Sequence, residues 1–234
     1  INSAADVDLV AVDAASFTQL DGSGTTTIGG ALTTSVGDVQ ITTNQIVQNA
    51  AISAAGEVVL DAAADIALNS GVLSAGNRLI HLIAGAGVLQ DAANHGGLSA
   101  TDLLLEGGGD FILVTDPGND NLITNVATVA PITGTVQFEN DQALVVGSVA
   151  DAAATNYDGV SAQDVLLSTS VGDLTNNQAV PATTGNVLLQ SQAGPAAVHP
   201  SGPAAHKLPS AADMGTSQPA LVPASPAKHR ATIA

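Results

Sequence analysis

Short stretches in which apolar and polar residues alternate recur along most of the chain. SVGDVQIT at residues 35–42 returns as AAGEVVLD at 54–61 and, less closely, at five further places. These are SAGNRLIH at 74–81, SATDLLLE at 99–106, ITGTVQFE at 132–139, SAQDVLLS at 161–168 and TTGNVLLQ at 183–190, and a degenerate copy, SAADVDLV, begins at Ser3. Alternation with period two, introduced by glycine, predicts β-strands with one buried face.

The copies are spaced like the turns of a solenoid. The glycine before each strand, or its substitute, falls at Gly37, Gly56, Gly76, Thr101, Gly134, Gln163 and Gly185, in steps of 19, 20, 25, 33, 29 and 22 residues. A step of about 20 residues provides three short strands and three turns, so the sequence predicts an all-β, parallel β-helix of about seven or eight turns with three sheets. The longer steps indicate loops inserted at residues 91–97, 107–121 and 150–158. An antiparallel sandwich fits less well, because its strands need no common phase.

Two apolar positions follow that glycine in most copies, at the second and fourth residues, and these should face the core. The third copy places Arg78 at the second position. Because burying an unpaired arginine is costly, we expect that turn to be shifted or distorted. The third position also carries aliphatic residues, among them Leu79, Leu104 and Leu188. This outward stripe is too apolar to stay bare, so an inserted loop, the C-terminal tail or another molecule should cover it.

Composition divides the chain at residue 192. The part before it takes its hydrophobicity from Ala, Val, Leu and Ile, and the whole chain has three Phe, one Tyr and no Trp, which predicts thin aliphatic core layers over residues 1–192. Residues 193–234 are rich in Pro and Ala, lose the repeat, and hold three of the four Lys and Arg residues. This second part is predicted to be a disordered or polyproline-like tail.

Charge limits the partners. The net charge is −17, and Arg78 is the single Lys or Arg before residue 192. Such a surface repels phosphate backbones and anionic lipids and attracts cations, which argues against nucleic-acid or membrane-surface binding. No apolar run approaches the roughly 20 residues that span a bilayer, and the first residues lack a signal-peptide pattern. The chain has no Cys, so it has no disulfide. We expect it to be a piece of a longer protein that does not insert into a membrane.

The repeat phrases resemble those of giant bacterial surface proteins. GDVQITTNQIVQNAAISAAGEVVLDAAADIALNSG and SAQDVLLSTSVGDLTNNQAVPATTGNVLLQ are similar to filamentous-haemagglutinin-like and autotransporter-passenger-like β-helix repeats, especially those of planctomycetes and environmental bacteria. The resemblance covers residues 5 to 192 and implies a right-handed β-helix on the cell surface or in the secreted matrix. It implies no catalytic residues, because the repeat motif has none.

One candidate site comes from stacking the fifth positions of the repeats. If all copies share one register, His81 lies between Asp61 and Glu106 along an outward column that continues to Glu139. Two flanking carboxylates should raise the pKa of His81. The group could serve in acid–base chemistry, in polysaccharide cleavage or as a metal site, and the alternative is an ion-pair ladder that relieves repulsion between carboxylates.

Calcium is the one cofactor that the residue types suggest. The loop TDPGNDN contains Asp116, Asn119, Asp120 and Asn121, whose oxygens suit a hard cation. The same letters are also good turn chemistry. A second acidic column, at the first position after each glycine, includes Asp38 and Asp164 and is a weaker candidate, because the nonapeptide spacing of calcium-binding β-rolls is missing.

These patterns favour a structural or adhesive segment of a large secreted or cell-surface bacterial protein. Its partners would be carbohydrate or protein on a surface, or other copies of the chain. The alternative is a β-helix hydrolase or lyase that acts on polysaccharide through Asp61, His81, Glu106 and Glu139, so the question of enzyme activity stays open at this point.

Overall fold

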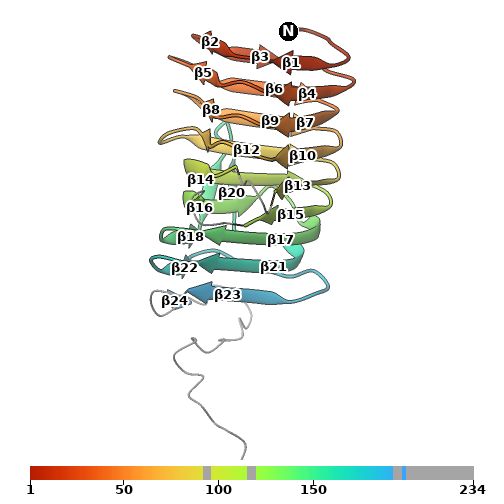
Figure 1. The fold of residues 1–234 in the computed structure, drawn as a ribbon. Coiled ribbons are helices and arrows are strands. Elements are labelled where there is room, and N and C mark those ends of the chain that lie inside the picture. The colour runs from red at the N-terminus through yellow and green to blue at the C-terminus, as the bar shows by residue number, and fades with distance from the viewer. Residues whose placement is uncertain (92–95, 115–119, 192–196, 199–234) are drawn as a thin grey trace, which may run out of the picture.

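The chain forms a solenoid of parallel β-strands with about eight turns (Figure 1). A computed structural model describes residues 1–91, 96–114, 120–191 and 197–198, and these residues contain strands, turns and bends but no helix. The predicted tail therefore lies outside the described residues, apart from β24 (Ala197–Val198). None of the described segments is a helix that could cross a membrane. The predicted all-β solenoid is confirmed.

Every turn contributes one strand to a nine-stranded sheet. Its order is β1 (Val7–Leu9), β4 (Thr25–Ile28), β7 (Gln45–Gln48), β10 (Asp65–Leu68), β13 (Gly87–Gln90), β15 (Asp110–Leu113), β17 (Ile132–Asn140), β21 (Ala162–Thr169) and β23 (Val187–Ser191). All the pairs in this sheet are parallel. The sheet runs from the first turn to the last, so it forms one continuous side of the stack.

A thirteen-stranded sheet forms the other sides. In the first four turns it has two arms, β2 (Val12–Ala14), β5 (Leu32–Thr34), β8 (Ile52–Ser53) and β11 (Leu73–Ser74), and β3 (Phe17–Gln19), β6 (Val39–Thr43), β9 (Val58–Ala62) and β12 (Leu79–Ala84). The ten residues of β14 (Leu98–Gly107) pair with β11 at one end and with β12 at the other. The sheet continues through β16 (Leu122–Thr128), β18 (Leu144–Val146), β22 (Leu174–Asn176) and β24. Two parallel sheets therefore replace the predicted three, because β14 joins the two arms.

The core is aliphatic along the whole stack, as predicted. The inward residues of the copies, such as Val39, Ile41, Val58 and Leu60, have no exposed surface. Phe111 and Phe138 are the largest fully buried side chains. Since each turn buries its apolar face against its neighbours, stability is shared between adjacent turns.

The third copy is shifted, as expected from Arg78. Val58 pairs with Ile80, and Ile80 pairs with Leu103, so Arg78 and not Gly76 precedes the inward positions. Gly76, with a φ of +55°, belongs to a turn in which the Arg78 N–H donates to Ala75 O at 3.0 Å. Arg78 is exposed at this corner, which avoids the cost of burying it.

An aspartate of one turn accepts a backbone hydrogen bond from the next turn at four corners. The pairs are Asp6 with Thr25 N, Asp38 with Glu57 N, Asp110 with Thr135 N and Asp164 with Asn186 N, at 2.7–2.8 Å. A glycine precedes each donor, and a Cβ at that glycine would collide with the aspartate carboxylate. We name this arrangement the aspartate–glycine clamp. It gives Asp38 and Asp164, which the sequence suggested as calcium ligands, a role in joining turns.

Candidate functional site

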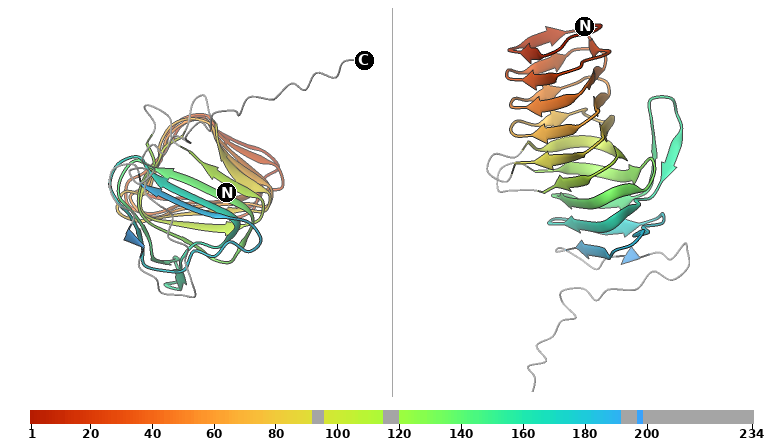
Figure 2. Two further views of the ribbon diagram at one scale, coloured as in Figure 1. Left: turned by 90° about the horizontal axis from the view of Figure 1, so that it is seen from below. Right: turned by 90° about the vertical axis from the view of Figure 1, so that its right-hand side faces the viewer.

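An inserted hairpin folds over the outer face of the thirteen-stranded sheet. Its strands are β19 (Ser148–Ala150) and β20 (Asn156–Asp158), which pair antiparallel and rise beside earlier turns in the right view of Figure 2. Val149 and Tyr157 pack against Leu79, Leu104 and Ala127. The insertion predicted at residues 150–158 therefore covers part of the aliphatic stripe, and Leu79 and Leu104 are buried as a result.

The turn of this hairpin is organised by one carboxylate. Asp151 Oδ1 accepts the N–H groups of Ala153 and Thr155 at 2.9 and 2.8 Å, and Oδ2 accepts the Tyr157 hydroxyl at 3.1 Å. These bonds, the one from Thr155 first, hold the pKa of Asp151 below its ordinary value. Ala154 adopts a φ of +62° to close the turn. Tyr157 is thus fixed over the sheet by its own turn.

His81 lies beside the hairpin and pairs with a carboxylate. Its Nε2 is 3.1 Å from Glu106 Oε2, and 9% of the residue is exposed. Burial lowers the pKa of His81, and this effect outweighs the opposite effects of Glu106, Asp151 and Asp61. The predicted raised pKa is therefore wrong, because the sequence could not indicate how far the fold buries the ring.

The stacking of His81 between two acids is also corrected. Asp61 and Glu106 both pair with Ile83, whereas His81 pairs with Val59 and Leu104. Asp61 and Glu106 are two strands apart, about 9.6 Å between their backbones. Burial raises the pKa of Asp61, and the charge of Glu106 raises it further. His81 reaches Glu106 from two residues away along its own strand.

Glu139 does not belong to this group. It lies on β17 in the nine-stranded sheet and pairs with Ser168, whereas Glu106 lies on β14 in the other sheet. The copies at residues 132–139, 161–168 and 183–190 lie in β17, β21 and β23 of the nine-stranded sheet. The strand that pairs with β14 in the other sheet is β16, whose residues 122–128 are not a copy of the phrase. The runner-up catalytic set is therefore reduced to Asp61, His81 and Glu106.

The predicted calcium loop is described only in part. Asp116 and Asn119 lie outside the described residues, and Asp120 is exposed. Asn121 is fully buried, and its Oδ1 accepts N–H groups from Gln90 and Leu98, both at 3.0 Å. Its amide nitrogen donates to Gln90 Oε1 at 3.1 Å and to Glu139 O at 3.0 Å. Asn121 therefore joins neighbouring turns, and any calcium ligand must come from the rest of the loop.

Comparison with models of known protein families, with curated proteins and with solved structures gives no match. Within the part of the chain that the structure describes, no group of three or more His, Asp or Glu side chains could hold a metal ion.

The site thus consists of a buried imidazole, two carboxyl groups and a hairpin that carries Tyr157. Sequence reasoning identified the insertion but not Tyr157 and Asp151. The available signal was that the single Tyr of the chain lies in the insertion. Chemically, the group can exchange protons through Asp61 or His81, and it can also fix the hairpin to the sheet.

Proposed function

We propose that this chain is a structural and adhesive segment of a large secreted or cell-surface bacterial repeat protein. One observation carries the proposal: the nine-stranded sheet is paired from β1 to β23 without interruption, over a core that runs the length of the stack. Such a stack is a quasi-one-dimensional spacer, since each turn contacts only its neighbours. The resemblance of the repeats to haemagglutinin-like β-helices supports the same role.

In this role the stack carries its binding features on its sides. The hairpin β19–β20 stands out from one side, and the acidic surface attracts cationic groups and divalent cations and repels anionic polymers. Its partners are carbohydrate or protein on another surface, or further copies of the chain. Calcium, bound by exposed carboxylates, would screen the repulsion between them.

Localisation tests this proposal directly. Antibodies raised against the purified chain are applied to intact and to permeabilised source cells, with a cytoplasmic protein as the control. Labelling of intact cells or of the culture medium, without labelling of the control, is the expected result. Labelling that requires permeabilisation would refute a surface or secreted role.

The alternative is hydrolysis or cleavage of polysaccharide, which the raised pKa of Asp61 favours. Asp61, with its raised pKa, would act as the general acid, and Glu106, two strands away, would be the second carboxyl group that glycoside hydrolysis requires. Release of reducing ends from acidic and neutral polysaccharides measures the activity. Asp61→Asn and Glu106→Gln should abolish it, whereas Glu139→Gln on the other sheet is the matched control. Equal activity in all three variants would eliminate this site.

A further inference from the structure

The outer face of the nine-stranded sheet carries a second aliphatic column. Paired residues along it are Val47, Ala67, Leu89, Ile112, Gln137, Leu166 and Leu188. Leu89 and Leu188 remain 57% and 42% exposed, in contrast to Leu79 and Leu104 beneath the hairpin. A column of this kind is unusual on a bare surface and indicates a binding face.

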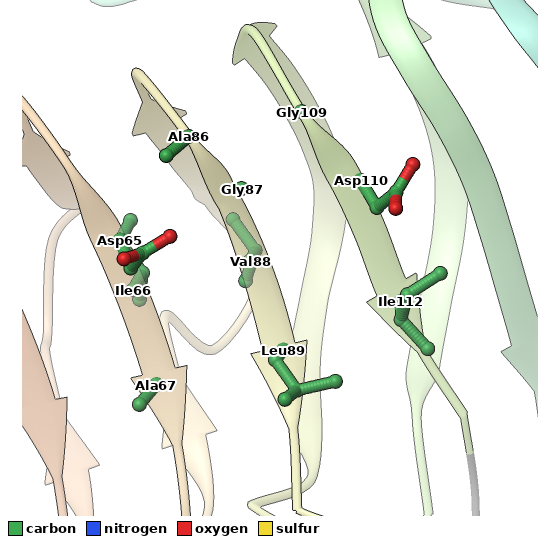
Figure 3. Close-up of a pocket in the computed structure, with 10 residues that line it drawn as sticks. All are labelled: Asp65, Ile66, Ala67, Ala86, Gly87, Val88, Leu89, Gly109, Asp110 and Ile112. Atoms are coloured by element: carbon green, nitrogen blue, oxygen red, sulfur yellow. The ribbon is translucent and has the colours of Figure 1, made fainter.

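Two hollows lie along this face. The larger one, of about 410 Å³, spans β10, β13 and β15, and Figure 3 shows Ala67, Leu89 and Ile112 along its floor. Gly87 leaves a gap in it, because it has no side chain between Asp65 and Asp110. A smaller hollow, of about 170 Å³, follows over β17, β21 and β23, beside Leu166 and Leu188. Because both hollows follow the same column, the face suits an elongated ligand that runs along the stack.

Acidic residues recur on this face at every second strand. Asp65 pairs with Gly87, Gly87 with Asp110, and the register continues through Thr135 to Asp164. Neighbouring strands are about 4.8 Å apart, so the acids repeat about every 9.6 Å along the stack. Among the residues that the structure describes, Arg78 is the single Lys or Arg, and it lies at a corner of the other sheet, away from these acids. The face therefore combines an apolar column with a periodic negative charge.

A polyproline II helix has the matching period. It contains three residues per turn and rises 3.1 Å per residue, so residues three apart lie on one side, about 9.3 Å from each other. Lys at every third position would meet Asp65, Asp110 and Asp164 in turn. The remaining residues would lie on Ala67, Leu89 and Ile112. Such a helix loses little entropy on binding, because its conformation is preformed.

We propose that the outer face of the nine-stranded sheet binds an extended, cationic polyproline II segment of a partner protein, aligned with the solenoid axis. Carboxylates of Asp65 and Asp110 pair with its basic side chains, and the aliphatic column receives its proline rings. This binding site is separate from the hairpin site and does not depend on the location of the protein.

Peptides of defined spacing test the proposal with the full chain. A fluorescent peptide of repeated Lys-Pro-Pro units is titrated by anisotropy against a peptide of repeated Lys-Pro-Pro-Pro units with the same number of lysines. In the second peptide successive lysines point to different sides of the helix, so they cannot all face the acids. The first peptide should bind about threefold to tenfold more tightly.

Matched protein variants locate the binding. Asp65→Asn combined with Asp110→Asn should weaken binding of the Lys-Pro-Pro peptide about threefold to tenfold. Asparagine at position 110 keeps an oxygen to accept the Thr135 N–H, now at 2.8 Å, so the clamp is retained. Asp13→Asn combined with Asp173→Asn is the control, because it removes the same charge from two exposed aspartates on the side of the thirteen-stranded sheet.

Three results would overturn the proposal. Equal affinity for the two peptides would show that only total charge matters. Equal weakening by the double variant and its control would place binding elsewhere. Retention of the protein on immobilised neutral polysaccharide, without any affinity for the peptides, would assign the face to carbohydrate instead.

Discussion

Replacing Gly185 with alanine should destabilise the wild-type protein, yet stabilise a protein that already carries Asp164→Ala. Gly185 precedes the donor of the last aspartate–glycine clamp, in which Asn186 N–H donates to Asp164 Oδ1 at 2.7 Å. A Cβ at Gly185 would meet Asp164 side-chain atoms as its three nearest neighbours, and not the backbone. Gly185 also has no positive φ, so alanine can adopt its conformation. The cost of the new methyl group should therefore depend on the carboxylate.

The magnitudes follow from two opposing effects. Alanine at Gly185 displaces the carboxylate and breaks its hydrogen bond, which costs about 1–2 kcal/mol for a partly solvated bond to a charged group. Replacing glycine at a compatible position stabilises by about 0.4–1 kcal/mol, because the unfolded chain loses freedom. Gly185→Ala should therefore cost about 0–1.6 kcal/mol in the wild type, with a midpoint of about 0.8 kcal/mol. Asp164→Ala should cost about 1–2 kcal/mol, and adding Gly185→Ala to it should recover about 0.4–1 kcal/mol.

Urea unfolding followed by circular dichroism measures the four proteins of this cycle. Hydrogen exchange of residues 185–191 shows whether the change lies in the last turn, since turns of a solenoid can open separately. Gly29→Ala is the control for the entropic effect, because its Cβ would meet only Leu9 O, at 3.7 Å. If Gly185→Ala has the same effect with and without Asp164, the clamp does not explain why glycine occurs there.

Three further predictions concern the hairpin and the core. Leu104→Ala should cost about 2–5 kcal/mol in urea unfolding, because the hairpin buries Leu104, whereas Leu188→Ala should stay within about 0.5 kcal/mol. Because burial lowers the pKa of His81, the unfolded chain binds a proton first as the pH falls below about 6.5, so stability should decrease there. Melting curves against pH should show a smaller decrease for His81→Gln, and an identical decrease would contradict the assigned pKa direction. Asn121→Ala should cost about 2–4 kcal/mol with or without Ca²⁺, since it leaves Gln90 and the Leu98 N–H without their partner, while Asp120→Ala is the exposed control. A loss confined to calcium-containing buffer would instead indicate a ligand role for Asn121.

The inward and outward phase of each strand could be predicted because a buried face demands alternation. Val58, Leu60, Leu103 and Leu105 were placed in the core by this rule alone, and they have no exposed surface. The insertion at residues 150–158 was also found, since it breaks the spacing. The spacing could not indicate where an insertion packs, because that depends on which apolar surface of the sheets lies within its reach. Val149 and Tyr157 pack against Leu79 and Leu104, and Leu104 pairs with His81 on the neighbouring strand.

The register predicted between the copies was wrong at Gly76, and the reason is physical. Two kinds of glycine occur before strands in this chain, and they look alike in sequence. Gly56 is a clamp glycine, whose missing side chain leaves room for Asp38. Gly76 has a φ of +55° and open space around its Cβ position, so it is required by a turn. Aligning both as one position moved His81 two residues along its strand, to the place of Ile83, and thereby placed it between Asp61 and Glu106.

The same clamp also explains why a repeat phrase does not identify its sheet. Asp38 and Gly56 precede β9 of the thirteen-stranded sheet, whereas Asp164 and Gly185 precede β23 of the nine-stranded sheet. The phrase therefore specifies a corner followed by a strand with one buried face, and both sheets contain such corners. After β14, the phrase recurs in strands of the nine-stranded sheet, where it makes the same corner contacts. Hence Glu106 and Glu139 share a position in the phrase but lie on different sides of the solenoid, and a catalytic pair inferred from phrase position needs the sheet of each member to be established first.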